Sequence, residues 1–253
     1  MRSLRIYVED IAGDWFAWIE GCPGAYARAG SPEQAIQQAP LALGNYVAWL
    51  RSHNHEAGAL SDATRTSLYI DVAERYKAER SNDGREVNAF FACHAAPLTN
   101  KDLDEYLCLL SYARSDLLNA LREIPPDEYH RAPFGGRSIS AILVHIAEAE
   151  RRALASVGLN ADAVDGRDAL LAIGMARRDT ERHLRTMDDR SRDRVIADAY
   201  GERWTARKAL DRVLWHERYH AAEVAERTNP GAFLRSILVR QEAAGDRSFA
   251  GVW

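Results

Sequence analysis

The chain has 253 residues, enough for one large domain or two of ordinary size. Hydrophobic residues make up 47 % of it, which is ample for a packed core. The formal net charge is -4, which argues against a general nucleic-acid binder, because such proteins usually carry a basic face. We therefore expect a globular protein that binds no nucleic acid.

Cysteine usage and apolar runs bear on the compartment. The three cysteines, Cys22, Cys93 and Cys108, form no CxxC pair, which is typical of a reducing compartment where thiols act as small buried hydrophobes. No run approaches the roughly 18 apolar residues of a membrane span. Glu9 and Asp10 interrupt the apolar core that a signal peptide would need. We expect a cytoplasmic protein without membrane contact.

The first half of the N-terminal region alternates between strand and turn signals. Residues 3–9 have strand period, residues 15–20 are rich in aromatic side chains, and residues 25–29 read as a third short strand. Ser31 then caps a helix that begins with Pro32 and runs to about residue 51. Pro40 predicts a kink or a short break within it.

Two more strands follow, over residues 66–76 and 86–93, with a strong turn signal at residues 81–84 between them. Residues 1–96 therefore predict a small α+β domain in which the helix covers an antiparallel sheet.

This N-terminal segment resembles the HicB-like antitoxin fold. The resemblance rests on residues 13–17 (GDWFA), 21–24 (GCPG) and 29–35 (AGSPEQA), which are similar to that family's aromatic strand, proline–glycine turn and helix start. Family members usually carry an appended DNA-binding module, and the sequence offers no segment for one. The resemblance therefore implies an interaction or structural domain, and we rank an antitoxin role below that.

The remainder, residues 97–253, predicts an all-α four-helix bundle with a C-terminal tail. A boundary at residues 97–100 precedes four amphipathic segments, at about 100–121, 139–157, 165–187 and 205–227. Thr99 or Asn100, Ser138 or Ser140, and Thr205 are the expected helix starts. A further short helical run is expected at 233–241. On the third helix, five residues are expected to face inward: Leu170, Ile173, Thr180, Leu184 and Met187. Its arginines, Arg177, Arg178, Arg182 and Arg185, are expected on a solvated face.

Three histidines of this region border the apolar stripes of their helices. His216 and His220 lie one turn apart on the last long helix, and His145 lies on the second. Three imidazoles from two packed helices would suit Zn, Ni or Fe and would leave a coordination position open, as catalytic sites do. The spacing alone is weak, since eight histidines in 253 positions give about 0.25 such i, i+4 pairs by chance. Ordinary helix histidines are the alternative.

The same region resembles the DinB/YfiT-like bundle family over residues 101–228. The residues that carry the resemblance are 137–146 (RSISAILVHI) and 210–220 (LDRVLWHERYH). The sequence departs from the family at Gly136 and Arg137, where a tryptophan is common. The resemblance implies that His145, His216 and His220 bind a divalent metal ion. It also implies a homodimer. It implies a small-molecule substrate too, because better understood members of the family resemble transferases or isomerases that use low-molecular-weight bacterial thiols.

Two carboxylates next to these histidines in sequence, Glu148 and Glu217, are candidate catalytic residues, as a general base or as a partner of an imidazole N–H. The alternative is that both are ordinary charged residues of a helix surface. This alternative fits Glu217 less well, because Glu217 falls within the apolar stripe. Two functions stay open. One is a metal-dependent hydrolase or thiol transferase, and the other is a non-catalytic, stress-related protein that binds a metal or a partner.

Overall fold

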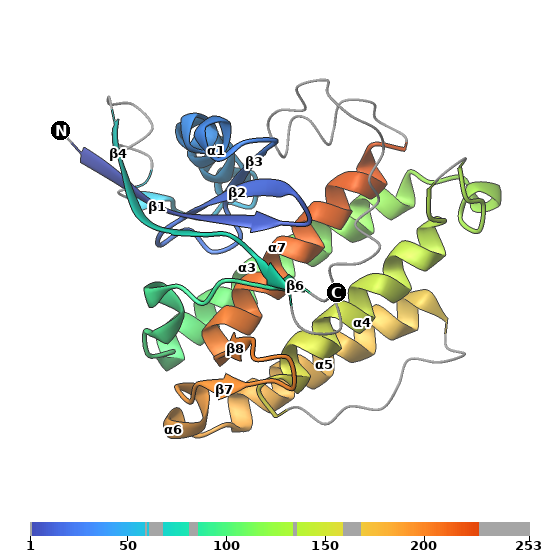
Figure 1. Ribbon diagram of the computed structural model, residues 1–253. Coiled ribbons are helices and arrows are strands. Elements are labelled where there is room, and N and C mark those ends of the chain that lie inside the picture. The colour runs from blue at the N-terminus through green and yellow to red at the C-terminus, as the bar shows by residue number, and fades with distance from the viewer. Residues whose placement is uncertain are drawn as a thin grey trace.

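The computed structural model describes residues 2–58, 60, 68–80, 86–133, 136–158 and 168–227 (Figure 1). An N-terminal sheet region is followed by a helical region, in the order expected from the sequence. The predicted turn at 81–84 and the predicted helical run at 233–241 lie outside the described residues.

The N-terminal sheet has four strands in the order β3-β2-β1-β4. Their bounds are β1 Arg2–Ile11, β2 Asp14–Ile19, β3 Tyr26–Ala29 and β4 Leu68–Tyr76. β1 pairs antiparallel with β2, but parallel with β4. The expectation of a wholly antiparallel sheet was therefore wrong. The chain crosses from β3 to β4 through a helix, and such a crossover lets a strand re-enter the sheet in the direction of its neighbour.

That helix, α1 (Pro32–Ser52), packs on β1, β2 and β3. The Ser31 side chain accepts a hydrogen bond from the Gln34 N–H, so the predicted N-cap is confirmed. Of the kink or short break predicted at Pro40, the break was wrong, since the helix continues through that residue, and the kink stays a prediction. Ala39 and Leu43 on either side of Pro40 are buried, and their packing holds the helix together where the proline N cannot donate a hydrogen bond.

The strand expected over residues 86–93 is much shorter than predicted. β5 (Glu79–Arg80) and β6 (Glu86–Val87) form a two-residue ribbon, and a 3-10 helix, η1 (Ala92–Ala95), follows. Side-chain carboxylates take the backbone donors in between: Glu9 accepts from the Ala89 N–H and Glu74 from the Ala92 N–H. These bonds replace those of a neighbouring strand, so strand geometry ends after Val87.

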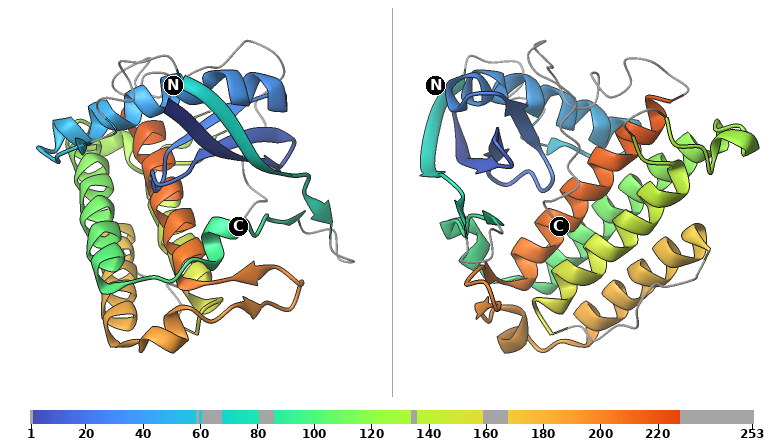
Figure 2. Two further views of the ribbon diagram at one scale, coloured as in Figure 1. Left: turned by 90° about the vertical axis from the view of Figure 1, so that its left-hand side faces the viewer. Right: turned by 45° about the vertical axis from the view of Figure 1, so that its right-hand side comes forward.

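The helical region contains four long helices that lie side by side (Figure 2). They are α3 (Asn100–Arg122), α4 (Ile139–Ala155), α5 (Ala169–Thr186) and α7 (Ala206–Ala225). Their N-caps are Thr99, Ser138, Asp168 and Thr205. α7 packs against both α3 and α4, and α4 packs against α5. Between α5 and α7 lie the short helix α6 (Asp189–Arg192) and a ribbon of β7 (Ile196–Ala197) and β8 (Arg203–Trp204).

The inward face predicted for α5 is mostly confirmed. Ile173, Thr180 and Leu184 are buried, and Met187 packs at the edge of the core. Leu170 is 46 % exposed, so its placement was wrong. It lies in the first turn, directly after the Asp168 cap, where the buried stripe begins with Ala169 and continues to Ala172.

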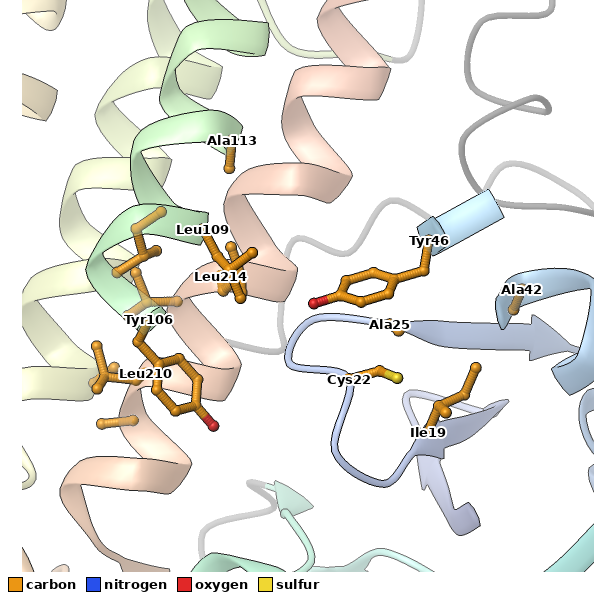
Figure 3. Packing of buried hydrophobic residues seen from close by; sticks show 14 of the residues in the cluster. Ile19, Cys22, Ala25, Ala42, Tyr46, Tyr106, Leu109, Ala113, Leu210 and Leu214 are labelled. Atoms are coloured by element: carbon orange, nitrogen blue, oxygen red, sulfur yellow. The ribbon is translucent and has the colours of Figure 1, made fainter. Parts of the chain in front are cut away.

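One hydrophobic core joins the sheet region to the helices (Figure 3). Ile19, Cys22 and Ala25 around the β2–β3 turn share a buried cluster with Leu109 of α3 and Leu214 of α7. The division of the chain after residue 96 remains a prediction. No helix within the described part of the chain is long and apolar enough to cross a membrane.

Candidate metal centre

The three histidines singled out from the sequence meet where α4 packs against α7. The His216 Nε2 atom lies 3.0 Å from Nε2 of His145 and 3.1 Å from Nε2 of His220. One ligand atom from each residue lies within 4.8 Å of the other two. His216 and His220 are buried, whereas His145 is half-buried. The structure thus brings together an i, i+4 pair and a histidine about seventy residues away, at the spacing that one small cation requires.

A carboxylate that sequence reasoning missed fixes the orientation of one imidazole. The His220 Nδ1 atom lies 2.5 Å from Glu223 Oε2. A neutral His220 therefore carries its proton on Nδ1 and donates a hydrogen bond from it to Glu223. The lone pair on Nε2 then faces His216. The available signal was the spacing, since a residue three positions after a histidine lies on the same helix face.

The hydrogen-bonding capacity of the cluster leaves room for a cation. Two of the three imidazoles touch the Nε2 atom of His216, yet a neutral imidazole carries a single N–H. The His216 ring can therefore donate a hydrogen bond in at most one of its two Nε2–Nε2 contacts. Convergent imidazole lone pairs are the donor set that borderline divalent metals prefer, so these residues fit such an ion.

Burial also keeps the three rings in the state that binds a metal. It lowers the pKa of His145 to about 4, with the charges of Arg137 and Arg152 adding to the effect. Burial lowers the pKa values of His216 and His220 well below the ordinary value, and the neighbouring imidazoles contribute in the same direction. All three histidines are thus neutral near pH 7.

Comparison with known proteins agrees with this assignment of the helical region. Residues 109–224 match the model of the DinB superfamily. The helical region is DinB-like. This family generally binds metal, and the three-histidine cluster is compatible with that property. No curated protein and no solved structure matches the chain.

Within the DinB-like region, Glu217 makes its contacts away from the imidazoles. Its carboxylate accepts hydrogen bonds from Arg114 Nε and Arg177 Nη2, and Arg177 Nε also donates to Glu150 at 2.8 Å. Burial would raise the pKa of Glu217, but the charges of Arg177 and Arg114 outweigh it and hold the pKa below its ordinary value. Glu217 is therefore part of a buried ion cluster that joins α7 to α3 and α5.

The same cluster corrects the expectation of a solvated arginine face on α5. Arg177 is 8 % exposed and lies inside the helical region. Arg182 does pair with Asp179 at the surface, as expected, and Arg185 pairs with Asp104 of α3. The sequence could not distinguish Arg177 from its neighbours, because its partners Glu150 and Glu217 are distant in sequence.

Glu148 lies on the exposed face of α4, one helical position after the buried Ala147. Arg137, one of the two residues at which the sequence departs from the family pattern, lies beside the three histidines: its Nη2 atom is 3.9 Å from Glu223 Oε2. The immediate surroundings of the histidines therefore contain Glu223 and Arg137.

Proposed function

We propose that the protein binds a divalent metal ion through His145, His216 and His220, and that it acts on a small molecule as a hydrolase or a small-thiol transferase. The observation that carries the proposal is the convergence of the three Nε2 atoms between α4 and α7. The DinB superfamily match over the same helices adds to it. Zn, Ni and Fe all suit three imidazoles.

The ion and the residues around it would have different roles. The ion would act as a Lewis acid that lowers the pKa of a coordinated water or thiol. Glu223 holds the His220 ring by accepting its Nδ1 proton. The positive charges of Arg137 and Arg152, which depress the pKa of His145, favour an anionic substrate at the half-buried side of the centre. For Glu217 we propose a positioning role, through its ion pairs, in place of proton transfer; Glu148 remains an untested candidate base.

The second candidate is a non-catalytic metal-binding or partner-binding protein. The burial of His216 and His220, at 5 % and 1 % exposure, favours it, because structural metal sites are closed. In that case the ion stabilises the α4–α7 contact, and the N-terminal region recruits a partner. The HicB-like character of that region, the four-helix bundle and the homodimer all remain proposals that rest on the sequence.

Metal analysis of the purified protein tests the proposal. We expect about one equivalent of a divalent transition metal in the wild type and almost none in His216→Ala/His220→Ala. His130→Ala serves as the control, because His130 is exposed and hydrogen-bonds to Ser140 outside the cluster. Equal metal content in the wild type and the double variant would refute the three-histidine site.

A second measurement separates the two candidate functions. Metal should be removed with a chelator and restored, with melting temperature and turnover of anionic thiols and hydrolysable esters followed in parallel. Turnover that disappears and returns with the metal supports the enzyme. A loss of melting temperature without turnover in any state supports the non-catalytic protein.

A further inference from the structure

A cavity lies on the side of α7 away from the three histidines, between the helices and the sheet region. It has a volume of about 560 Å³, within the range of small-molecule sites. The described residues that line it come from β1, β2 and the β2–β3 turn, from α1 and the segment after it, from η1 and the residues on both sides of it, and from α3 and α7. None of them belongs to α4 or α5. Asp211 lines the cavity five residues before His216, which places it ~140° away around the helix. The cavity is thus separate from the three histidines.

Aromatic rings form much of its wall. Five aromatic residues line it, each from a different element or its flank: Tyr7, Trp18, Tyr46, Phe91 and Tyr106. Figure 3 shows Tyr46 pointing from α1 toward α7, with its hydroxyl in the space between them. Tyr46 is 3 % exposed, and its hydroxyl forms no hydrogen bond with any residue that the structure describes. A buried hydroxyl of this kind at a cavity wall is available to a ligand.

The charge of the lining is negative. Five carboxylates line the cavity, Glu20, Glu56, Asp102, Glu105 and Asp211, against two arginines, Arg207 and Arg212. Both arginines are already paired. Arg207 donates to Asp102 at 2.7 Å, and Arg212 donates to the buried Glu9 at 2.6 Å. Burial and the nearby arginines lower the pKa of His94, which leaves that ring neutral. Glu105 lies 3.2 Å from Nε2 of His55, and Arg218, which is not a lining residue, places a further guanidinium 5.3 Å from the centre of the Tyr46 ring. With Asp102 paired to Arg207, the negative charge that faces the space therefore comes from Glu20, Glu56 and Asp211.

Asp211 is the carboxylate best placed to meet a ligand. Its Oδ1 atom accepts a hydrogen bond from the Tyr106 hydroxyl at 2.7 Å, and Asp211 forms no ion pair within the described part of the chain. Burial raises its pKa to about 6, against the opposing influence of Tyr106, Arg207 and Arg212. A carboxylate that burial has taken out of water, and that has no direct ion pair, gains more from an incoming cation than one in water does.

From the cavity, its aromatic wall and the carboxylate of Asp211, we propose that this site binds a small organic cation, a primary amine on an aromatic or apolar body. The ammonium group donates to Asp211 and to the Tyr46 hydroxyl, while the apolar body contacts the rings. Aromatic faces attract cations, and this attraction grows when water is excluded. Neutral and anionic molecules of the same shape lack the charge that the site selects.

Calorimetric titration of the full chain with three matched probes tests the proposal. The probes are 2-phenylethylamine, 2-phenylethanol and phenylacetate, which share a ring and differ in charge. We expect the amine to bind at least about tenfold more tightly than the alcohol, and phenylacetate to bind weakest. Quenching of tryptophan fluorescence gives a second readout, because Trp18 lines the cavity. Equal affinity for the amine and the alcohol, or no binding of the amine at millimolar concentration, would overturn the proposal.

Variants locate the site. Asp211→Asn keeps an acceptor for Tyr106 and removes the charge, and it should weaken the amine at least about tenfold. Asp104→Asn removes the same charge from an exposed position on α3 and should leave affinity unchanged. If Asp211→Asn does not fold, Tyr46→Phe replaces it and should weaken the amine alone. If Asp211→Asn, or Tyr46→Phe where it is used instead, binds the amine as tightly as the wild type does, the assignment is wrong.

His216→Ala/His220→Ala should bind the amine as the wild type does, so this test is independent of the test of the metal centre. Loss of amine binding in that variant would contradict a separate site.

Discussion

At the scale of single residues, the candidate metal centre contains one carboxylate that is not among the three candidate ligands. Glu223 selects the His220 tautomer in which the Nε2 lone pair faces the other two imidazoles. The sequence pointed instead to Glu148 and Glu217, because they are adjacent or close in sequence to a histidine. Helical geometry, not adjacency, decides which side chains meet. The three histidines themselves could be predicted, since spacing and resemblance both point to them.

Glu223→Gln gives the first prediction at this scale. A neutral amide is a weaker acceptor for the His220 Nδ1 proton, so we expect metal affinity to fall about 10- to 100-fold without loss of folding. Competition with a chromophoric chelator measures the change. Glu181→Gln, an exposed change on α5, is the matched control. Unchanged affinity in Glu223→Gln would show that the 2.5 Å contact does not orient the ring.

At the scale of elements, the sequence predicted the features that depend on neighbouring residues. It did not predict those that depend on residues distant in sequence. The caps Ser31, Ser138 and Thr205 act within a few residues, and the sequence revealed each of them as a start or as one of two. The parallel pairing of β1 with β4 depends on a crossover that no local pattern encodes. The burial of Arg177 is of the same kind, because its carboxylate partners come from α4 and α7.

The ion cluster on Glu217 holds α7 in position, and Glu217→Gln tests its strength. The variant leaves the half-buried Arg114 and the buried Arg177 with one carboxylate fewer, so the free energy of unfolding should fall by about 3 kcal/mol at pH 7. Urea unfolding measures it, and Glu148→Gln on the exposed face of α4 is the control. A loss below about 1 kcal/mol would mean that the cluster contributes little.

The pH dependence of this effect has a definite sign. The pKa of Glu217 in the folded protein lies below its ordinary value of 4.5, so the stabilisation is present above that pH and is lost as the pH falls through the folded value. The difference between the wild type and Glu217→Gln should therefore shrink in acid below about pH 4.5. A difference that grows in acid would contradict the ion-pair assignment.

At the scale of the whole molecule, the sheet region and the helices share one buried cluster, so we expect them to unfold as one unit. The β2–β3 turn lies against α7, and Gly24 in that turn approaches the helix closely: a Cβ placed there would lie 2.8 Å from Leu214 Cγ. We expect one cooperative transition, with helical circular dichroism and tryptophan fluorescence coinciding. Two separated transitions would favour independent domains divided after residue 96.

A pair of glycines in this turn allows a controlled test. Gly21 and Gly24 have nearly equal positive φ angles, +70° and +71°, but only Gly24 faces α7. Gly21→Ala should cost about 1 kcal/mol from backbone conformation alone. Gly24→Ala should cost about 1–3 kcal/mol more, because the added methyl group meets Leu214. Similar losses in both variants would show that the turn does not press on α7.

The position of α7 between the two sites has a consequence for communication between them. One helix supplies Asp211 to the cavity and His216 and His220 to the metal centre, so ligands at the two sites share a single rigid element. Allosteric coupling would require that helix to have two positions of similar free energy. The ion pairs of Glu217 with α3 and α5 favour one position only. Amine and metal are therefore expected to bind without cooperativity, each with the same affinity whether or not the other is present.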